Sequence, residues 1–261
     1  NVDIRRNEAT CGGGVYSPLD SDLVIVNSLL DSNVASISGG GLYTNASISC
    51  KIYDSVFRNN SALSANGGGA YLVSSLTSSN SESRSAFFSN LSFVDNSAMN
   101  GGGGGIFRSG NVSVTVWNSS FWSNTGLEGG GLYLVNGSSA FTNVSLISND
   151  GLEDGGGLIA SEEESLVMKS CRLRGNSAGE AGGALHVSHG AQVQASGTMY
   201  SENVAYGSLV GGGALYADTG STVSCEGDLF ESNRASQGSG GGVYMNGLSE
   251  LTCSSCLIQN N

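Results

Sequence analysis

The sequence predicts an all-β fold: a right-handed single-stranded parallel β-helix of about nine turns, each turn built from three short strands. Two recurring motifs carry this prediction. The first is Gly-Gly-[Gly/Ala] followed by an aliphatic residue, and the second is [Phe/Leu/Tyr]-x-x-Asn. Both occur nine times along the chain, with triplets 26 to 36 residues apart. Most of these spacings are too short for a propeller blade, and nothing between the motifs has a helical pattern.

The glycine motif opens the first strand of each turn. Its third position falls at Gly14, Gly41, Gly69, Gly105, Gly131, Gly157, Ala184, Ala214 and Gly242. The following residue is always aliphatic, from Val15 to Val243, so we expect this column to face the interior.

The other two strands follow from the same alternation. The second alternates small polar with apolar residues, as in residues 112–116, and its inward column runs from Ile25 to Thr252. The third strand carries the aromatic or leucine of the second motif, from Leu30 to Leu257, and this column is also expected inside. A column of Asn, Asp, Gly and Ser precedes it by three residues and ends at Ser254. These residues suit a left-handed bend between the second and third strands.

The motif asparagines are predicted to form a structural ladder, because stacked amides can hydrogen-bond from turn to turn and satisfy the backbone at a corner. They are Asn33, Asn60, Asn96, Asn124, Asn149, Asn176, Asn203, Asn233 and Asn260.

We expect residues 1–261 to form a single repeat domain. One insertion near 74–85 lengthens the 36-residue repeat and is interpreted as a solvated loop. The chain begins and ends inside the repeat pattern, so we expect it to be a segment of a longer chain. Alternatively, another copy covers its strand edges and the copies associate end to end.

The charge balance argues against two classes of partner. The net charge is −12 and the lysines are two, Lys51 and Lys169, so a nucleic acid or an anionic membrane is a poor fit. No apolar run approaches the ~18 residues of a membrane span, which argues against direct membrane insertion. The expected partners are proteins, by end-to-end self-association or contact with other surface proteins, and glycans.

The repeats resemble those of the chlamydial polymorphic outer-membrane proteins and related surface adhesins. Representative matches are Phe57-Arg58-Asn59-Asn60 with Gly67-Gly68-Gly69-Ala70, and Leu173-Arg174-Gly175-Asn176 with Gly182-Gly183-Ala184-Leu185. The resemblance covers nearly the whole chain and implies a β-helical, autotransporter-like surface adhesin.

No catalytic, cofactor or metal site is expected. Galacturonan hydrolases place several aspartates, a His-Gly pair and a basic residue on adjacent turns. Here Asn124-Thr125-Gly126, Asp150-Gly151 and His189-Gly190 lack paired aspartates beside them. Residues 162–164, all glutamate, are interpreted as a solvated acidic bulge rather than a Ca²⁺ site. His186 and His189 are expected on the surface, not on a metal.

Three further groups of residues are candidates for function. The six cysteines include Cys225, Cys253 and Cys256, among which a local disulfide is expected, whereas Cys50 and Cys225 also fit buried positions. Seven Asn-x-Ser sequons for glycosylation occur at Asn45, Asn59, Asn90, Asn111, Asn118, Asn136 and Asn143. An aromatic strip, which either stabilises the strands or contacts a sugar or a protein, comprises Tyr16, Tyr43, Tyr71, Phe107, Tyr133, Tyr216 and Tyr244.

The function expected from these patterns is a non-catalytic extracellular or cell-surface module, structural or adhesive: a rod-like unit of a surface glycoprotein or filament. The alternative is a polysaccharide-active β-helix enzyme, a lyase or hydrolase, which would need a groove lined by convergent carboxylates. An ice-binding role would need a flat, regular threonine array, and the ten threonines are scattered.

Overall fold

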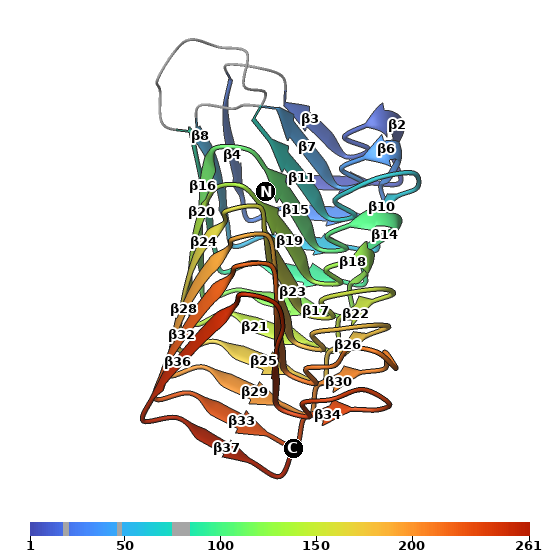
Figure 1. Cartoon of the computed structure of the whole chain (residues 1–261). Coiled ribbons are helices and arrows are strands. Elements are labelled where there is room, and N and C mark those ends of the chain that lie inside the picture. The colour runs from blue at the N-terminus through green and yellow to red at the C-terminus, as the bar shows by residue number, and fades with distance from the viewer. Residues whose placement is uncertain (18–20, 46–48, 75–83) are drawn as a thin grey trace.

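The computed structural model describes residues 1–17, 21–45, 49–74 and 84–261, and within them it is a helix-free parallel β-solenoid (Figure 1). The turns stack along one axis from the N-terminal to the C-terminal end. Each strand pairs in parallel with its equivalent one turn later, so neighbouring strands lie ~4.8 Å apart. The predicted parallel β-helix is confirmed.

The described strands form four sheets, which we name by their features. The motif sheet carries the Phe-x-x-Asn motif and contains β1 (Asp3–Arg5), β5 (Leu29–Asp31), β9 (Val56–Arg58), β13 (Ser92–Val94), β17 (Ser120–Trp122), β21 (Ser145–Ile147), β25 (Arg172–Arg174), β29 (Met199–Ser201), β33 (Leu229–Glu231) and β37 (Leu257–Gln259). The short sheet follows the ladder asparagines and contains β2 (Glu8–Cys11), β6 (Val34–Ser38), β10 (Ser61–Ala62), β14 (Ser97–Gly102), β18 (Thr125–Glu128), β22 (Asp150–Gly151), β26 (Ser177–Ala178), β30 (Val204–Ala205) and β34 (Arg234–Ala235).

The other two sheets follow the glycine triplets. The aromatic sheet contains β3 (Val15–Ser17), β7 (Leu42–Asn45), β11 (Ala70–Val73), β15 (Ile106–Ser109), β19 (Leu132–Val135), β23 (Leu158–Ser161), β27 (Leu185–Val187), β31 (Leu215–Ala217) and β35 (Val243–Met245). The wide sheet is built from strands of five or six residues. It contains β4 (Asp22–Val26), β8 (Ser49–Tyr53), β12 (Arg84–Ser89), β16 (Val112–Trp117), β20 (Ser138–Thr142), β24 (Ser165–Lys169), β28 (Gln192–Ser196), β32 (Thr222–Glu226) and β36 (Glu250–Ser254).

The short sheet is the one that the repeat pattern did not predict. Several of its strands are only two residues long, such as Ser61–Ala62, and a two-residue strand is too short to show an alternation of apolar and polar residues. Each described turn therefore has four strands where three were expected.

The three columns expected inside all lie in the core, together with further buried residues such as Leu72, Val114 and Leu166. The motif column is completely buried through the middle of the solenoid, and its rings stack: Phe57 on Phe93 at 4.7 Å between centroids and Phe93 on Phe121 at 4.9 Å. The column after the glycines is buried from Leu42 to Leu215 and partly exposed in the terminal turns.

The expected alignment of the last turn was wrong by one residue. Ile258, not Leu257, is in register with Phe230, and Cys253, not Thr252, is in register with Cys225. Leu257 and Ile258 are both apolar, so composition alone could not decide which of them continues the column.

The glycine triplets lie where the backbone of one turn packs directly on the backbone of the next turn. Gly39 has a positive φ of 70°, which L side chains rarely adopt. A Cβ on Gly40 would lie 2.5 Å from both N and O of Ser61 in the next turn, so the short sheet leaves no room for a side chain there.

The predicted left-handed bend lies between the wide and motif sheets. Asn27, Asp54 and Asn118 each have a φ of 47° at this corner. In the last turn the residue with positive φ is Ser255 (55°) rather than the expected Ser254. The expected insertion loop lies largely outside the described residues, but Arg84 and Ser85 already belong to β12.

Candidate functional surfaces

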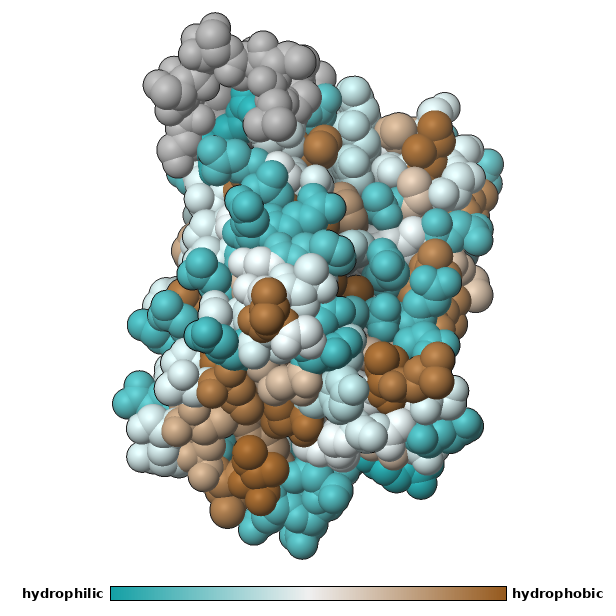
Figure 2. Space-filling model, viewed as in Figure 1, coloured by the Kyte–Doolittle hydropathy of each residue, from teal (hydrophilic) through white to brown (hydrophobic). Residues whose placement is uncertain are grey.

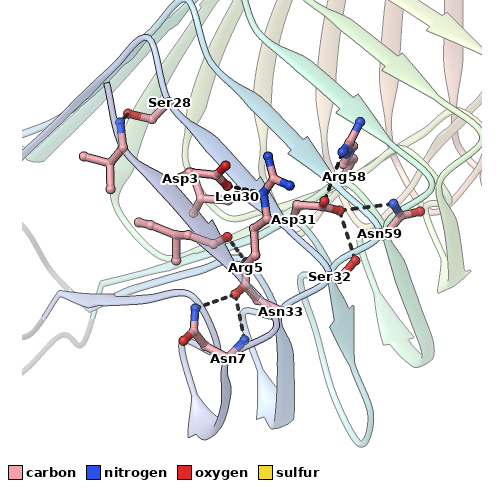
Figure 3. A network of polar contacts seen from close by, with 12 residues as sticks. Asp3, Arg5, Asn7, Ser28, Leu30, Asp31, Ser32, Asn33, Arg58 and Asn59 are labelled. Atoms are coloured by element: carbon pink, nitrogen blue, oxygen red, sulfur yellow. Dashed lines mark hydrogen bonds and ion pairs between the residues drawn. The ribbon is translucent and has the colours of Figure 1, made fainter.

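The asparagine ladder is the most regular polar feature of the core. In each step the backbone N and Nδ2 of one asparagine both donate to Oδ1 of the asparagine one turn later. From Asn33 to Asn60 these distances are 3.0 and 3.0 Å. Asn33 Nδ2 also donates to the Ile4 carbonyl at 2.9 Å (Figure 3). Every ladder amide in the middle of the solenoid is fully buried and hydrogen-bonded, which is the stacked arrangement that the sequence predicts.

The ladder differs from the prediction at both ends. Asn261, not Asn260, accepts the two bonds from Asn233, at 2.9 and 2.8 Å, and Asn260 has a positive φ of 54°. At the other end Asn7 donates to Asn33 Oδ1 at 3.1 Å from its backbone and 2.9 Å from its side chain. Asn7 does not match the sequence motif, because Ile4 and not Phe, Leu or Tyr precedes it by three residues.

A carboxylate beside the ladder anchors the N-terminal turns. Asp31 accepts hydrogen bonds from Arg58 at 3.0 Å, Asn59 at 3.3 Å and Ser32 at 3.0 Å (Figure 3). The Arg58 guanidinium is the main reason that the pKa of Asp31 falls to about 2 from 3.8. Asn59 is a predicted sequon, and its Nδ2, the atom that would carry a glycan, is engaged here.

Six of the seven sequon asparagines are exposed and lie in turns; Asn45 is half-buried at the end of β7 with its Oδ1 buried. Asn90, Asn118 and Asn143 lie on the bend between the wide and motif sheets, all with positive φ. Their sequon serines, Ser92, Ser120 and Ser145, are register partners in successive strands.

Two of these sequons are in direct contact. Asn143 Nδ2 donates to Asn118 Oδ1 at 2.8 Å, and Asn90 Nδ2 donates to Asp54 Oδ1 at 2.9 Å. The turns are only ~4.8 Å apart, so glycans on Asn118 and Asn143 would compete for the same space.

The aromatic strip forms a stacked column on the aromatic sheet. Tyr16, Tyr43, Tyr71 and Phe107 stack in sequence, with centroids 5.1, 5.0 and 5.3 Å apart. Phe107 meets Tyr133 edge-on at 5.4 Å. A break at Ile159 separates this run from Tyr216 and Tyr244, which stack at 5.6 Å.

Most of this column is covered. Tyr16 is 55% exposed, but Phe107 is 8% and Tyr216 4% exposed. The end of a short-sheet strand lies against one of these rings: a Cβ on Gly102, the last residue of β14, would lie 2.1 Å from Cδ1 of Tyr133. The stacked rings therefore link adjacent turns, and their exposed fraction falls from 55% at Tyr16 to 8% at Phe107.

His186, which was wrongly expected on the surface, lies beside the carboxylate of Asp154. His186 is 9% exposed, and its Nδ1 lies 3.6 Å from Oδ1 of Asp154, beyond hydrogen-bonding distance. Burial, followed by the charges of Asp154 and Glu153, raises the pKa of Glu128. Burial also raises the pKa of Tyr133. His189 is exposed, as expected.

A buried ion pair joins Arg108 and Glu164, both fully inaccessible to solvent. The expected solvated bulge at residues 162–164 is therefore wrong for Glu164. Arg108 occupies the inward position that Leu72 and Leu134 take in adjacent turns. Its guanidinium also donates to the Val135 carbonyl at 2.9 Å and to Ser139 Oγ at 2.8 Å.

Gly137 provides the space for this guanidinium. A Cβ at residue 137 would lie 2.2 Å from Nη1 of Arg108. In the next two turns the equivalent positions are Glu164 and Ala191, as the pairing of their neighbours shows. The corner between the aromatic and wide sheets therefore holds three interdependent residues: an arginine, its carboxylate and a glycine.

The six cysteines are all free thiols. Cys50 and Cys225 are buried, as expected, and burial raises the pKa of Cys50 to about 12 and that of Cys225 further. Cys225 and Cys253 are register partners in β32 and β36, and Cys256 follows at the next corner.

The outer face of the wide sheet is three residues broad and consists mostly of Ser, Thr and Gln. Trp117, at its edge, is 49% exposed, and Trp122, across the bend, is 56% exposed. Two shallow depressions of about 210 and 120 Å³ indent the C-terminal part of this face. They share Gln194 and Ser224, and each is lined by one carboxylate, Glu226 or Glu250.

Two specific features are absent from the described part of the chain. No three His, Cys, Asp or Glu side chains there are placed to hold a metal ion. Nor does that part contain a helix of the length and apolar character that crossing a membrane requires.

Comparison with known proteins gives no match, whether to a protein-family model, a curated protein or a solved structure.

Proposed function

We propose that this chain is a non-catalytic structural or adhesive module that lies outside the cell or on its surface. The observation that carries the proposal is the asparagine ladder, which runs unbroken through nine steps from Asn7 to Asn261. A continuous column of buried, paired amides makes a stiff repetitive body, which is what a spacer or adhesive rod requires.

The surface chemistry supports a location outside the cell. Six exposed sequon asparagines lie in turns, where a glycan would not disturb a strand. The register of Cys225 with Cys253 places two thiols on neighbouring strands at a separation compatible with a disulfide, given small adjustments of the side chains. We therefore include N-glycosylation and a disulfide among Cys225, Cys253 and Cys256 in the proposal.

Protein partners fit this surface better than nucleic acid or membrane lipid, because the net charge is −12. The two ends of the ladder are also complementary. Asn7 carries the acceptor Oδ1, and Asn261 carries a backbone donor at the opposite end. A further turn of the same repeat, from this chain or from another copy, would continue the ladder in either direction, and this is the proposed basis of end-to-end association.

The observation that bears most directly on the alternative function, a polysaccharide lyase or hydrolase, is the pair of depressions on the wide sheet. Hydrolysis by the common mechanisms needs two carboxylates about 5–9.5 Å apart, flanking one bond. Each depression is lined by one carboxylate, with Lys169 beside Glu226 in the larger. This arrangement fits sugar contact better than hydrolysis.

An assay of polysaccharide turnover separates the two functions. The purified chain is incubated with neutral and acidic polysaccharides, and reducing ends and unsaturated products are measured against a Glu226→Gln, Glu250→Gln double variant. We expect no turnover by either protein. Turnover by the native chain that the double variant loses would replace this proposal with the enzymatic one.

A further inference from the structure

The outer face of the short sheet carries an apolar stripe. In β10, β22 and β30 the second residue is buried, whereas the first residue and the residue directly after the strand, here called the third position, are more exposed. Large apolar residues occupy the third position in five turns: Leu63, Met99, Leu127, Leu152 and Tyr206. Hydrogen bonds such as Leu152 N to the Gly126 carbonyl (2.9 Å) hold them in one column.

These side chains are exposed to an unusual degree. Leu63 is 51%, Met99 56%, Leu152 41% and Tyr206 50% exposed, and Leu127 is half-buried between them. Figure 2 shows hydrophobic residues at several heights along the side of the solenoid formed by the short sheet, on the right of the view. An apolar stripe on a chain of net charge −12 indicates a contact surface.

We propose that this face binds the same face of a second copy, antiparallel, about a two-fold axis at Leu127. Leu127 lies in the middle turn of the nine in this sheet. An antiparallel copy then brings Met99 against Leu152 and Leu63 against Gly179, whose lack of a side chain leaves room for the leucine. A face that pairs with itself in this way closes as a dimer.

The charges along the face fit this orientation. In the first outward column Glu8 lies four turns before Thr125, and Arg234 lies four turns after it. The two-fold axis therefore places Glu8 of each copy opposite Arg234 of the other. Val34 and Val204, three turns from the centre on either side, also meet. A parallel arrangement would instead place the two Glu8 residues in the same turn, with Arg234 of either copy eight turns away.

The area predicts a weak association. Nine turns ~4.8 Å apart make a face roughly 40 Å long and about 10 Å wide, or about 400 Å² on each copy, against about 800 Å² for a stable interface. The dimer is therefore expected at high protein concentration. The pairing stands apart from the proposed function, since it does not depend on where the protein is located.

Sedimentation of the 261-residue chain in reducing buffer, over a concentration series, tests the pairing; the reductant prevents exposed Cys253 from linking copies. We expect a monomer–dimer equilibrium that Leu127→Asp weakens at least about thirtyfold, because two carboxylates then meet on the axis. Trp117→Asp, on the wide sheet in a neighbouring part of the same turn, is the matched control and should leave the equilibrium unchanged. A native chain that is monomeric at every concentration, or a dimer lost in the control alone, overturns the proposal.

The orientation is tested by charge reversal, with variants at exposed positions that need no core rearrangement. Glu8→Arg and Arg234→Glu should each weaken self-association about threefold to tenfold. A mixture of these two variants should form a heterodimer in preference to either homodimer, because both cross-pairs become attractive. A mixture that shows no such preference contradicts the antiparallel arrangement.

Discussion

Asn149 and Asn176 are joined by two hydrogen bonds that converge on one atom. The backbone N and Nδ2 of Asn149 both donate to Oδ1 of Asn176, at 3.0 Å each. Asn176 repeats the arrangement toward Asn203, at 2.9 Å for both bonds. The Asn176 side chain thus accepts hydrogen bonds from the preceding turn, and Asn176 donates to the side chain of the following turn. Each ladder residue is therefore bonded to two neighbouring turns.

Replacing a ladder residue should therefore destabilise the fold. Asn176→Ala leaves the buried backbone N of Asn149 without its acceptor, and we expect a loss of about 1–3 kcal/mol in the free energy of unfolding. Urea unfolding measures the loss. Asn111→Ala, in an exposed turn, is the control and should change stability by less than about 0.5 kcal/mol. If the two variants were equally stable, the ladder would not contribute to the stability of the fold.

The Arg108–Glu164 pair should behave as a unit. Glu164→Ala leaves a fully buried guanidinium without its carboxylate, so we expect a loss of about 3–5 kcal/mol. The double variant Arg108→Leu, Glu164→Ala uses the residues found at the equivalent positions of other turns, leucine at 134 and alanine at 191. It should be more stable than Glu164→Ala in chemical denaturation. Additive losses in the double variant would show that the two residues are not coupled.

Acid should weaken the contribution of Asp31 to the free energy of unfolding. Its pKa is depressed in the folded chain, so the stabilisation is fully present above about 3.8 and is lost as the pH falls toward about 2. Asp31→Asn should accordingly be less stable than the native chain at neutral pH, with the difference shrinking through this window. Arg58→Met removes the partner and should show the same convergence in thermal unfolding. A stability difference that does not vary with pH would rule out this role for the Asp31 charge.

Glycans should be distributed by exposure and by spacing between turns. In a eukaryotic secretory host we expect occupancy at exposed Asn118 or Asn143, but few molecules with both, because the two amides are in contact. Peptide mapping by mass spectrometry gives site occupancy, and the intact mass shows whether both sites are filled together. A glycan on buried Asn60 or Asn176 would contradict the assignment of the ladder to the interior.

The fold followed from the sequence because its inward columns tolerate almost no charge. Where a column holds only Leu, Ile, Val and Ala, its direction is decided by burial alone, and the structure places it inside from Leu42 to Leu215. The short sheet was missed because two residues, such as Ser61 and Ala62, cannot display a period.

The polar interior was harder to foresee. Arg108 breaks the rule that identified the core, and its partner lies 56 residues away in the sequence, so no local pattern links them. The coverage of the aromatic column was also hidden, because it depends on neighbouring backbone that packs closely through glycines such as Gly102 at the end of β14. Long-range partners and loop paths are fixed by tertiary packing, which a repeat pattern does not encode.

The central claim, that this chain is a rod-like module on the outside of the cell, is tested most directly by locating it. Antibodies against the folded chain are applied to unpermeabilised cells of the source organism and detected with gold particles in the electron microscope. We predict label on the outer surface or on extracellular filaments. Label that appears only after permeabilisation, inside the cell, would contradict the claim.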